Sequence, residues 1–220
     1  MSAHLARTPK SGSRFGRNPA GFVLAMALQA SAVSAQSEAQ RSCTVDAVSG
    51  ALAEVSINQQ WQPIAQGQAV PIDARVRTGP DTRMHLSCDD GIAVTVGAAT
   101  EIALDGLVGP SGPEHSIGLH LFSGITGIVA PRRNWDKFEV ATDVAIASVR
   151  STEWLVESDK EGGAVFTRRG RVEVQAGGAK VSLGAGKGVT VSAKAVAGPV
   201  MTWSAKRLAE AGRALGYDWK

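Results

Sequence analysis

Short runs in which every second residue is apolar follow one another from residue 44 to about residue 193. Period-two alternation places alternate side chains on one face, so each run predicts a half-buried β-strand. The clearest runs are residues 51–57, 83–87, 92–96, 117–121, 137–140, 171–174 and 189–191. Gly, Pro, Asp and Asn separate the runs, and Asp90-Gly91 predicts a hairpin with a two-residue type I′ turn.

No long helical pattern separates these strands, so the sequence predicts an all-β domain over residues 44–198. Two architectures fit short, closely spaced strands: a β-sandwich-like fold and a β-solenoid-like fold. A strict repeat is not visible in the sequence, so the pattern does not choose between them.

Two segments depart from the strand pattern. Residues 106–118 are rich in Gly and Pro and predict an exposed loop. Residues 199–220 change to a helical period and predict an amphipathic helix that begins after Thr202 or Ser204 and ends at Gly216. Its apolar face contains Trp203, Leu208, Ala211 and Leu215. We expect this helix to cap the β core, with a partner-binding or membrane-surface helix as the alternatives.

The first 35 residues have the pattern of a secretory signal peptide. Four Lys and Arg side chains precede an apolar run from Ala20 to Ala35, which ends in small residues. We expect cleavage after Ala35, a short linker over residues 36–43, no transmembrane span in the cleaved chain, and a periplasmic or secreted location. An uncleaved membrane anchor is the alternative, although the run is short and contains Gln29 and Ser31.

This segment also changes the reading of charge. The whole chain has a formal net charge of +3, but residues 36–220 contain 19 basic and 20 acidic residues. A nucleic-acid partner is therefore not expected, because it would need a basic surface.

The two cysteines, Cys43 and Cys88, both follow the predicted cleavage site. An isolated pair in an exported protein predicts one disulfide. Free thiols or metal ligands are the alternatives, and no CxxC or His-rich set accompanies them.

The sequence contains no complete catalytic or metal-binding motif of the kinds considered below. His85 and His120 lie in predicted strands and His115 in a polar loop, without metal-ligand spacing. The glycine-rich run 184–188 lacks the Ser or Thr and the first Gly of a phosphate-binding loop. Turn chemistry explains the carboxylate pairs Asp89-Asp90 and Glu157/Asp159. We therefore expect no enzyme activity, no cofactor and no metal.

Several segments, in order, resemble the FecR domain family. The first half of the resemblance lies in residues 47–50, 61–67, 76–83, 90–96 and 100–102. The second half lies in residues 119–125, 138–142, 149–156, 167–174 and 185–186. Together they extend over most of residues 44–192, with Ser151 where the family usually has Gly and Asp143 where it often has Pro.

The resemblance implies an all-β periplasmic module and a set of residues with structural roles. These are Trp61, Gly67, Thr78, Gly79, Gly91, Gly124, Arg150, Thr152, Glu153, Gly170 and Gly186. The glycines suit tight turns or close backbone packing. Trp61 and Trp154 are expected to cover the ends or faces of the core, whereas an exposed Trp would indicate a contact site. Arg150 and Glu153 are expected to pair with groups on adjacent strands.

Well-known members of the family are transmembrane anti-sigma regulators that receive a signal from a TonB-dependent receptor, often for iron uptake. Only residues 1–19 precede the apolar run here, which is short for an anti-sigma segment, so we expect that segment to be missing. Our first functional hypothesis is a non-enzymatic binding module of the cell envelope, whose partner is an envelope protein or polymer. The alternatives are a soluble accessory of an iron-responsive signalling system and, last, an envelope hydrolase.

Overall fold

A computed structural model of the chain describes residues 40–71, 74–104, 106–107, 109–110, 116–131, 137–149 and 152–216. Backbone contacts divide the chain into two units, residues 1–36 and 37–220, and all described residues belong to the second unit. The predicted signal peptide, His115, Arg150 and Ser151 lie outside the described residues.

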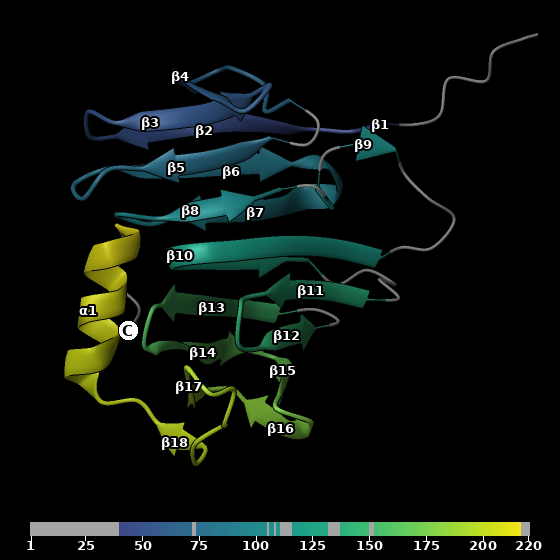
Figure 1. Cartoon of the computed structure of the whole chain (residues 1–220), viewed down its shortest axis with the longest axis vertical. Coiled ribbons are helices and arrows are strands. Elements are labelled where there is room, and N and C mark those ends of the chain that lie inside the picture. The colour runs from purple at the N-terminus through teal and green to yellow at the C-terminus, as the bar shows by residue number, and fades with distance from the viewer. Residues whose placement is uncertain are drawn as a thin grey trace, which may run out of the picture. The chain divides into compact units, whose positions relative to one another are not determined.

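The strands form two sheets that share one long strand, β10 (Ser116–Ala130) (Figure 1). We call them sheet I and sheet II. Sheet I has the order β2 (Cys43–Ser49), β6 (Arg83–Cys88), β7 (Ile92–Val96), β10, β13 (Thr152–Asp159), β14 (Gly162–Arg169), β17 (Lys187–Ser192) and β18 (Met201–Thr202).

Sheet II runs alongside it and contains the first half of β10. Its order is β4 (Gln60–Pro63), β3 (Ala53–Ile57), β5 (Arg75–Thr78), β8 (Glu101–Ala103), β10, β11 (Lys137–Ala141), β12 (Ile146–Val149), β15 (Arg171–Ala176) and β16 (Ala179–Gly184). Among the described strands, only the pairing of β10 with β11 is parallel. A separate short pair joins β1 (Gln40–Arg41) to β9 (Gly109–Pro110).

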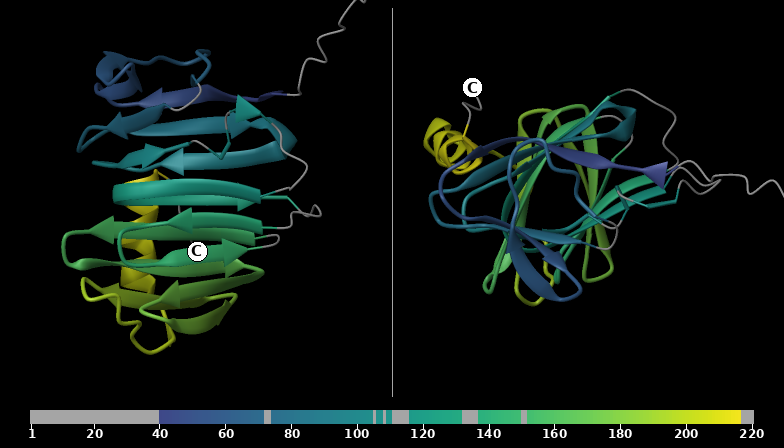
Figure 2. Two further views of the ribbon diagram at one scale, coloured as in Figure 1. Left: turned by 45° about the vertical axis from the view of Figure 1, so that its right-hand side comes forward. Right: turned by 90° about the horizontal axis from the view of Figure 1, so that it is seen from above.

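Successive hairpins alternate between the two sheets, as β11–β12, β13–β14 and β15–β16 show. The described unit therefore has the facing sheets of a sandwich and the stepwise stacking of a solenoid (Figure 2). This confirms the predicted all-β fold with a C-terminal helix. The strands begin at Gln40 and continue to Thr202, beyond both predicted limits of the β domain.

β10 passes from one sheet to the other at a bend. Its first half pairs with β8 and β11, and its second half, from Gly124, pairs with β13. Gly124 has a φ of +92°, a conformation that residues with a Cβ rarely adopt. The sequence predicted only residues 117–121 of this strand, because the bend interrupts the alternation of apolar residues there.

The inward side chains of both sheets form one apolar core, made mainly of Val, Ile and Leu. Trp154 is fully buried within it and contacts Phe138 edge-on, with ring centroids 5.1 Å apart. The expectation that Trp154 covers an end or face of the core is therefore wrong, because its strand turns the ring inward.

Two local predictions need correction. β6 and β7 form the expected hairpin, but its loop is the three-residue turn Asp89–Gly91 with Gly91 at φ +74°, which replaces the two-residue type I′ turn. Residues 106–118 are not one exposed loop: Leu107 is buried, the amide of Gly106 donates to the carbonyl of Gly118, and β10 has already begun.

Helix α1 (Ala205–Leu215) crosses the outer face of sheet I, as Figures 1 and 2 show. Ser204 caps its first turn by accepting from the amide of Arg207, and Gly216 ends it with a φ of +86°. Ala211 and Leu215 pack on Ile125, Leu155 and Phe166, with Trp203 and Leu208 beside them. The predicted helix, its apolar face and its capping of the core are confirmed.

The C-terminal end of α1 is hydrogen-bonded to β6 and to the segment that follows β7. Arg83 of β6 donates from Nη2 to the carbonyl of Arg213 at 2.5 Å and from Nε to that of Ala214 at 3.1 Å. The amide of Ala98 donates to the carbonyl of Ala214 at 3.0 Å. Among the described residues, no helix is long and apolar enough to cross a membrane.

Candidate functional site

Asp89 and His85, two side chains of types that catalysis or metal binding could use, make local contacts. Asp89 accepts from the amide of Ser42 at 2.6 Å, and His85 Nδ1 lies 3.2 Å from the hydroxyl of Thr95. Within the described ranges, no group of three His, Cys, Asp or Glu side chains is placed to hold a metal ion. The glycine-rich run 184–188 is the turn between β16 and β17, with Gly186 at φ +77°.

The motif residues that the resemblance singled out occupy turns and buried bonds. Gly67, Gly91, Gly124, Gly170 and Gly186 all have positive φ angles. The hydroxyl of buried Thr78 donates to the carbonyl of Gly97 at 2.5 Å and accepts from the amide of Thr100 at 3.1 Å. The amide of Gly79 donates to the carbonyl of Leu52, in the turn after β2, at 2.8 Å. The hydroxyl of Thr152 lies 3.4 Å from the carbonyl of Arg171. These bonds and turn conformations fix the local backbone geometry at these positions.

Cys43 and Cys88 form a disulfide directly across the ladder between β2 and β6. Both side chains are buried at the first end of sheet I. The bond closes a 45-residue separation that contains β3, β4 and β5 of sheet II. The disulfide therefore joins two adjacent strands of sheet I, while the chain between its two cysteines forms strands of sheet II.

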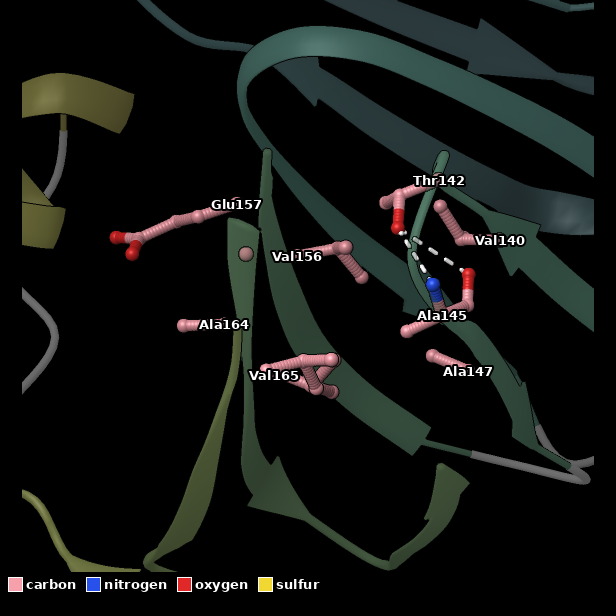
Figure 3. Close-up of a pocket in the computed structure, with 10 residues that line it drawn as sticks. Val140, Thr142, Ala145, Ala147, Val156, Glu157, Ala164 and Val165 are labelled. Atoms are coloured by element: carbon pink, nitrogen blue, oxygen red, sulfur yellow. Dashed lines mark hydrogen bonds between the residues drawn. The ribbon is translucent and has the colours of Figure 1, made fainter. Parts of the chain in front are cut away.

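The interior offers no ligand cavity where Figure 3 shows its lining. Val140, Ala147, Val156 and Val165 face one another there, and the space between them has no room for a water molecule. Thr142 accepts from the amide of Ala145 at 3.0 Å and closes the β11–β12 turn. Figure 3 also shows that the Glu157 carboxylate points away from this region.

Glu157 belongs to a different arrangement, on the outer face of sheet I. The sequence assigned it with Asp159 to a polar turn, which is wrong for Glu157, because it lies within β13 and its carboxylate pairs with Arg207 of α1. Burial raises the pKa of Glu157, and this effect exceeds the opposing attraction of Arg207. Two open hollows of about 680 and 460 Å³ flank this ion pair.

The outer face of sheet II carries a row of stacked arginine and aromatic side chains, which we call the Arg–aromatic face. It comprises Glu54, Trp61, Arg75, Arg77, Glu101, His120, Phe122 and Asp143. In β5 the two arginines alternate with buried Val76, so this strand turns both outward, whereas Asp143 lies in the turn between β11 and β12.

At one end of this face, Arg77 lies between a ring and a carboxylate. Its guanidinium carbon is 4.2 Å from the centroid of the Trp61 ring, and its Nε is 2.6 Å from a Glu54 oxygen. Stacking on the ring fixes the plane of the guanidinium group. Trp61 is thus a partly exposed surface residue, the position that would indicate a contact site.

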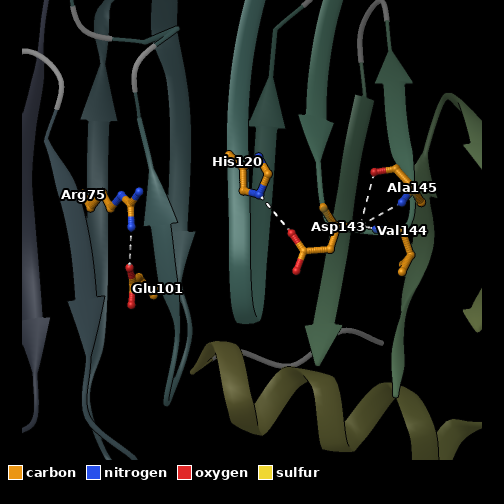
Figure 4. Close-up of polar contacts among 7 residues, drawn as sticks. Arg75, Glu101, His120, Asp143, Val144 and Ala145 are labelled. Carbon is orange, nitrogen blue, oxygen red and sulfur yellow. Dashed lines mark hydrogen bonds and ion pairs between the residues drawn. The ribbon is translucent and has the colours of Figure 1, made fainter. Parts of the chain in front are cut away.

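Towards β10, Phe122 is enclosed by two side chains. The guanidinium carbon of Arg75 lies 4.2 Å from the Phe122 centroid, and the His120 ring lies 4.4 Å from it. Arg75 also pairs with Glu101 at 3.3 Å, and His120 Nε2 lies 3.5 Å from Asp143 (Figure 4). These contacts join residues of different strands, so they depend on strand register, which the sequence pattern does not give.

Glu153 contributes a second polar group, on sheet I. Its carboxylate accepts from Arg168 at 2.6 Å and lies 3.8 Å from Nε of Arg169, both on the adjacent strand β14. Glu153 thus pairs with an adjacent strand of its own sheet. It lies on the outer face of sheet I, which α1 partly covers.

Comparison with known proteins gives a family match and a similarity to solved structures. Residues 74–173 match the family model described as FecR protein. No curated protein sequence matches the chain. Two crystal structures of a candidate anti-sigma factor from Parabacteroides distasonis, at 2.50 and 1.65 Å resolution, each align with a TM-score of 0.49 and 19% identity.

That alignment covers 58% of this chain and 57% of the other chain, so a little over half of each is compared. The family match lies inside the segment 44–192 in which the resemblance was found and includes the bend of β10. The match to the FecR family therefore extends over residues 74–173, a little under half of the chain.

Proposed function

We propose that this protein is a non-enzymatic binding module of the cell envelope and that the Arg–aromatic face is its contact surface. The module would act outside the cytoplasm after removal of residues 1–35, as the N-terminal sequence pattern suggests. The observation that carries the proposal is the stacking of Arg77 on Trp61 and of Arg75 on Phe122 on one exposed sheet face.

The position of this face supports the proposal. Helix α1 covers the part of the outer face of sheet I around Ile125, Leu155 and Phe166, whereas no such helix packs on the described outer face of sheet II, where Arg75, Ile146 and Glu173 are exposed. A flat sheet face that displays Trp and Arg has the composition of energetic hot spots in protein interfaces.

The conformations of these side chains support it further. Each arginine is held by an aromatic ring and by a carboxylate, which limits its rotamers before any partner binds. A partner would then bind without the entropic cost of ordering two long side chains, roughly 0.5–1.5 kcal/mol each.

The FecR domain is consistent with a role in envelope signalling. In the regulators that the sequence resembles, this domain is the periplasmic part that receives a signal from another protein. We extend only the interaction role to this chain, because contact with a protein partner is what its exposed face can provide.

Site-specific photo-crosslinking in cells that express the full chain tests the proposal. A photoreactive amino acid replaces Ser56 or Ile146 on the outer face of sheet II, and Ala93 or Thr190 on that of sheet I as matched controls. We expect a discrete cross-linked species, recovered from the extracytoplasmic fraction, from the first two positions only.

Substitution of the face completes the experiment. Trp61→Ala combined with Arg77→Ala should remove at least four-fifths of the cross-link at Ser56, while Arg169→Ala on β14 should leave it unchanged. Equal cross-linking from both sheets, or none from sheet II, would show that this face is not the contact surface. A broad smear in place of a discrete species would identify a polymer as the partner.

A further inference from the structure

The edge strands of the two sheets differ in whether other segments of the chain hydrogen-bond to their outer backbone groups. At the first end of sheet I, the segment after β4 covers the edge of β2: the amide of Val45 donates to the carbonyl of Gln68 at 2.9 Å, and that of Val70 donates to Cys43 at 2.9 Å. This edge therefore has partners for its backbone groups.

The last end of sheet I is also covered. β18 pairs with Lys187 and Gly188 of β17. Beyond them, the amide of Gly198 donates to the carbonyl of Thr190 at 2.8 Å, and the amide of Ser192 donates to that of Val196 at 3.0 Å. At the first end of sheet II, β4 is four residues long and ends in Pro63, which cannot donate.

The last strand of sheet II, β16, lacks such a cover. It is six residues long and contains no proline. Among the described residues, its backbone bonds run to β15 alone. An uncovered edge of this length is a template for another strand, which native folds normally protect.

The register of the β15–β16 hairpin identifies the free groups. Gly177 and Gly178 have φ angles of +52° and +84°, as a two-residue type I′ turn requires, and Ala176 pairs with Ala179 across it. The pair that flanks such a turn exchanges both backbone bonds, and bonded pairs then alternate. The backbone groups of Lys180 and Ser182 therefore point to the open edge.

The side chains of β16 define what a partner strand must carry. Val181 and Leu183 face the core, whereas Lys180 and Ser182 lie on the outer face with Glu173. A strand added to β16 would place apolar residues beside Val181 and an acidic residue beside Lys180. A second copy of β16 does not fit this, because the strand contains no acidic residue.

Exposed apolar side chains occur at the same end of the stack. Val196, Val200 and Met201 are 63%, 42% and 59% exposed, and they lie in the segment between β17 and α1, which includes β18. Three large apolar side chains are thus exposed within six residues of this segment.

We propose that the open edge of β16 binds an extended segment of a partner protein as an additional antiparallel strand of sheet II. The segment alternates apolar residues, directed toward the core side of the sheet, with acidic residues on the outer side. The main-chain groups of Lys180 and Ser182 supply the bonds, and Lys180 supplies the charge preference. This inference does not depend on the Arg–aromatic face.

A synthetic peptide tests the proposal on the full chain. The probe is a fluorescein-labelled peptide of eight residues in which Val and Glu alternate, and its affinity is measured by fluorescence anisotropy. We expect saturable binding and slower hydrogen exchange of the Lys180 and Ser182 amides, while the Val181 amide, already bonded to β15, changes little.

Two methylated peptides serve as matched controls that leave the protein unchanged. In an antiparallel pair, residues directly opposite each other share a face, so the glutamates lie opposite Lys180 and Ser182 and their amides form the bonds. N-methylation of the glutamates should weaken binding at least tenfold, and N-methylation of the valines should not. The reverse result would overturn antiparallel addition at this edge.

Ser182→Pro removes an edge donor, and its matched control Ser182→Ala keeps that donor. We expect at least a tenfold loss of affinity for Ser182→Pro and less than a twofold change for Ser182→Ala. Equal affinity of both variants would overturn the proposal, as would dimerisation of the free chain that Ser182→Pro abolishes. If the unmodified chain does not bind the peptide while cross-linking at Ser56 occurs as expected, this inference is overturned and the proposed function stands.

Discussion

Glu157 shows how a single residue balances burial against a charge partner. Its carboxylate lies under α1, and burial raises its pKa although Arg207 is paired with it. A carboxyl whose pKa is raised by folding stabilises the folded state below the unfolded value, here 4.5, and that contribution is lost as the pH rises through the raised pKa.

We therefore predict that Glu157→Gln gains stability relative to the unmodified protein as the pH rises from 4 to 7. The measurement is the free energy of unfolding in urea at each pH. Glu161→Gln, in the exposed turn before β14, corrects for the removal of one negative charge. If the variant instead loses stability toward pH 7, the pair with Arg207 outweighs burial.

The sequence singled out Trp61 through the family resemblance, but it did not single out Arg75 or Arg77. Arg77 meets Trp61 only because β3 lies between β4 and β5. Glu157 was assigned to a turn because Gly162 and Gly163 follow it closely. Its true surroundings depend on α1, which lies 50 residues further along the chain.

At the scale of elements, α1 packs across three strands of sheet I, namely β10, β13 and β14. It could be predicted closely, because a Ser cap, an apolar face and a terminal Gly are all local signals. β10 could not, because its length depends on a bend at Gly124 that serves two sheets. Local chemistry determines where a helix ends, whereas the extent of a strand depends on its neighbours.

We predict that Leu215→Ala destabilises the protein by about 2–4 kcal/mol, the usual cost of removing a buried leucine side chain. Leu215 is fully buried against the cluster formed by Ile125, Leu155 and Phe166. Lys206→Ala, on the exposed side of α1, should change the unfolding free energy by less than about 0.5 kcal/mol. Urea unfolding followed by far-UV circular dichroism measures both.

The chain contains five tryptophans, so the difference in fluorescence between the protein and a Trp203→Phe variant adds a local measurement of α1. The Trp203 ring lies 4.8 Å from that of Phe166, so detachment of α1 alone would change its emission before the sheets unfold. Coincident transitions would show that α1 and the sheets unfold as one unit. Equal stability of Leu215→Ala and Lys206→Ala would contradict a stabilising role for the helix.

For the whole molecule, the order of the strands decides what the disulfide does. Cys43 and Cys88 are neighbours in sheet I, but the chain between them leaves that sheet to form β3, β4 and β5. The cysteine pairing could be expected from composition and export. Its placement around strands of the other sheet could not, because no sequence period reveals the alternation of hairpins between sheets.

Chain entropy predicts that the disulfide stabilises the protein by about 4 kcal/mol, since it restricts a loop of 45 residues in the unfolded state. We expect Cys43→Ala and Cys88→Ala, singly and together, to lose similar amounts, because each removes the same constraint. The urea m-value should also rise, because an unfolded chain without the bond exposes more surface. A loss confined to Cys43→Ala, with an unchanged m-value, would assign the effect to packing in the core instead.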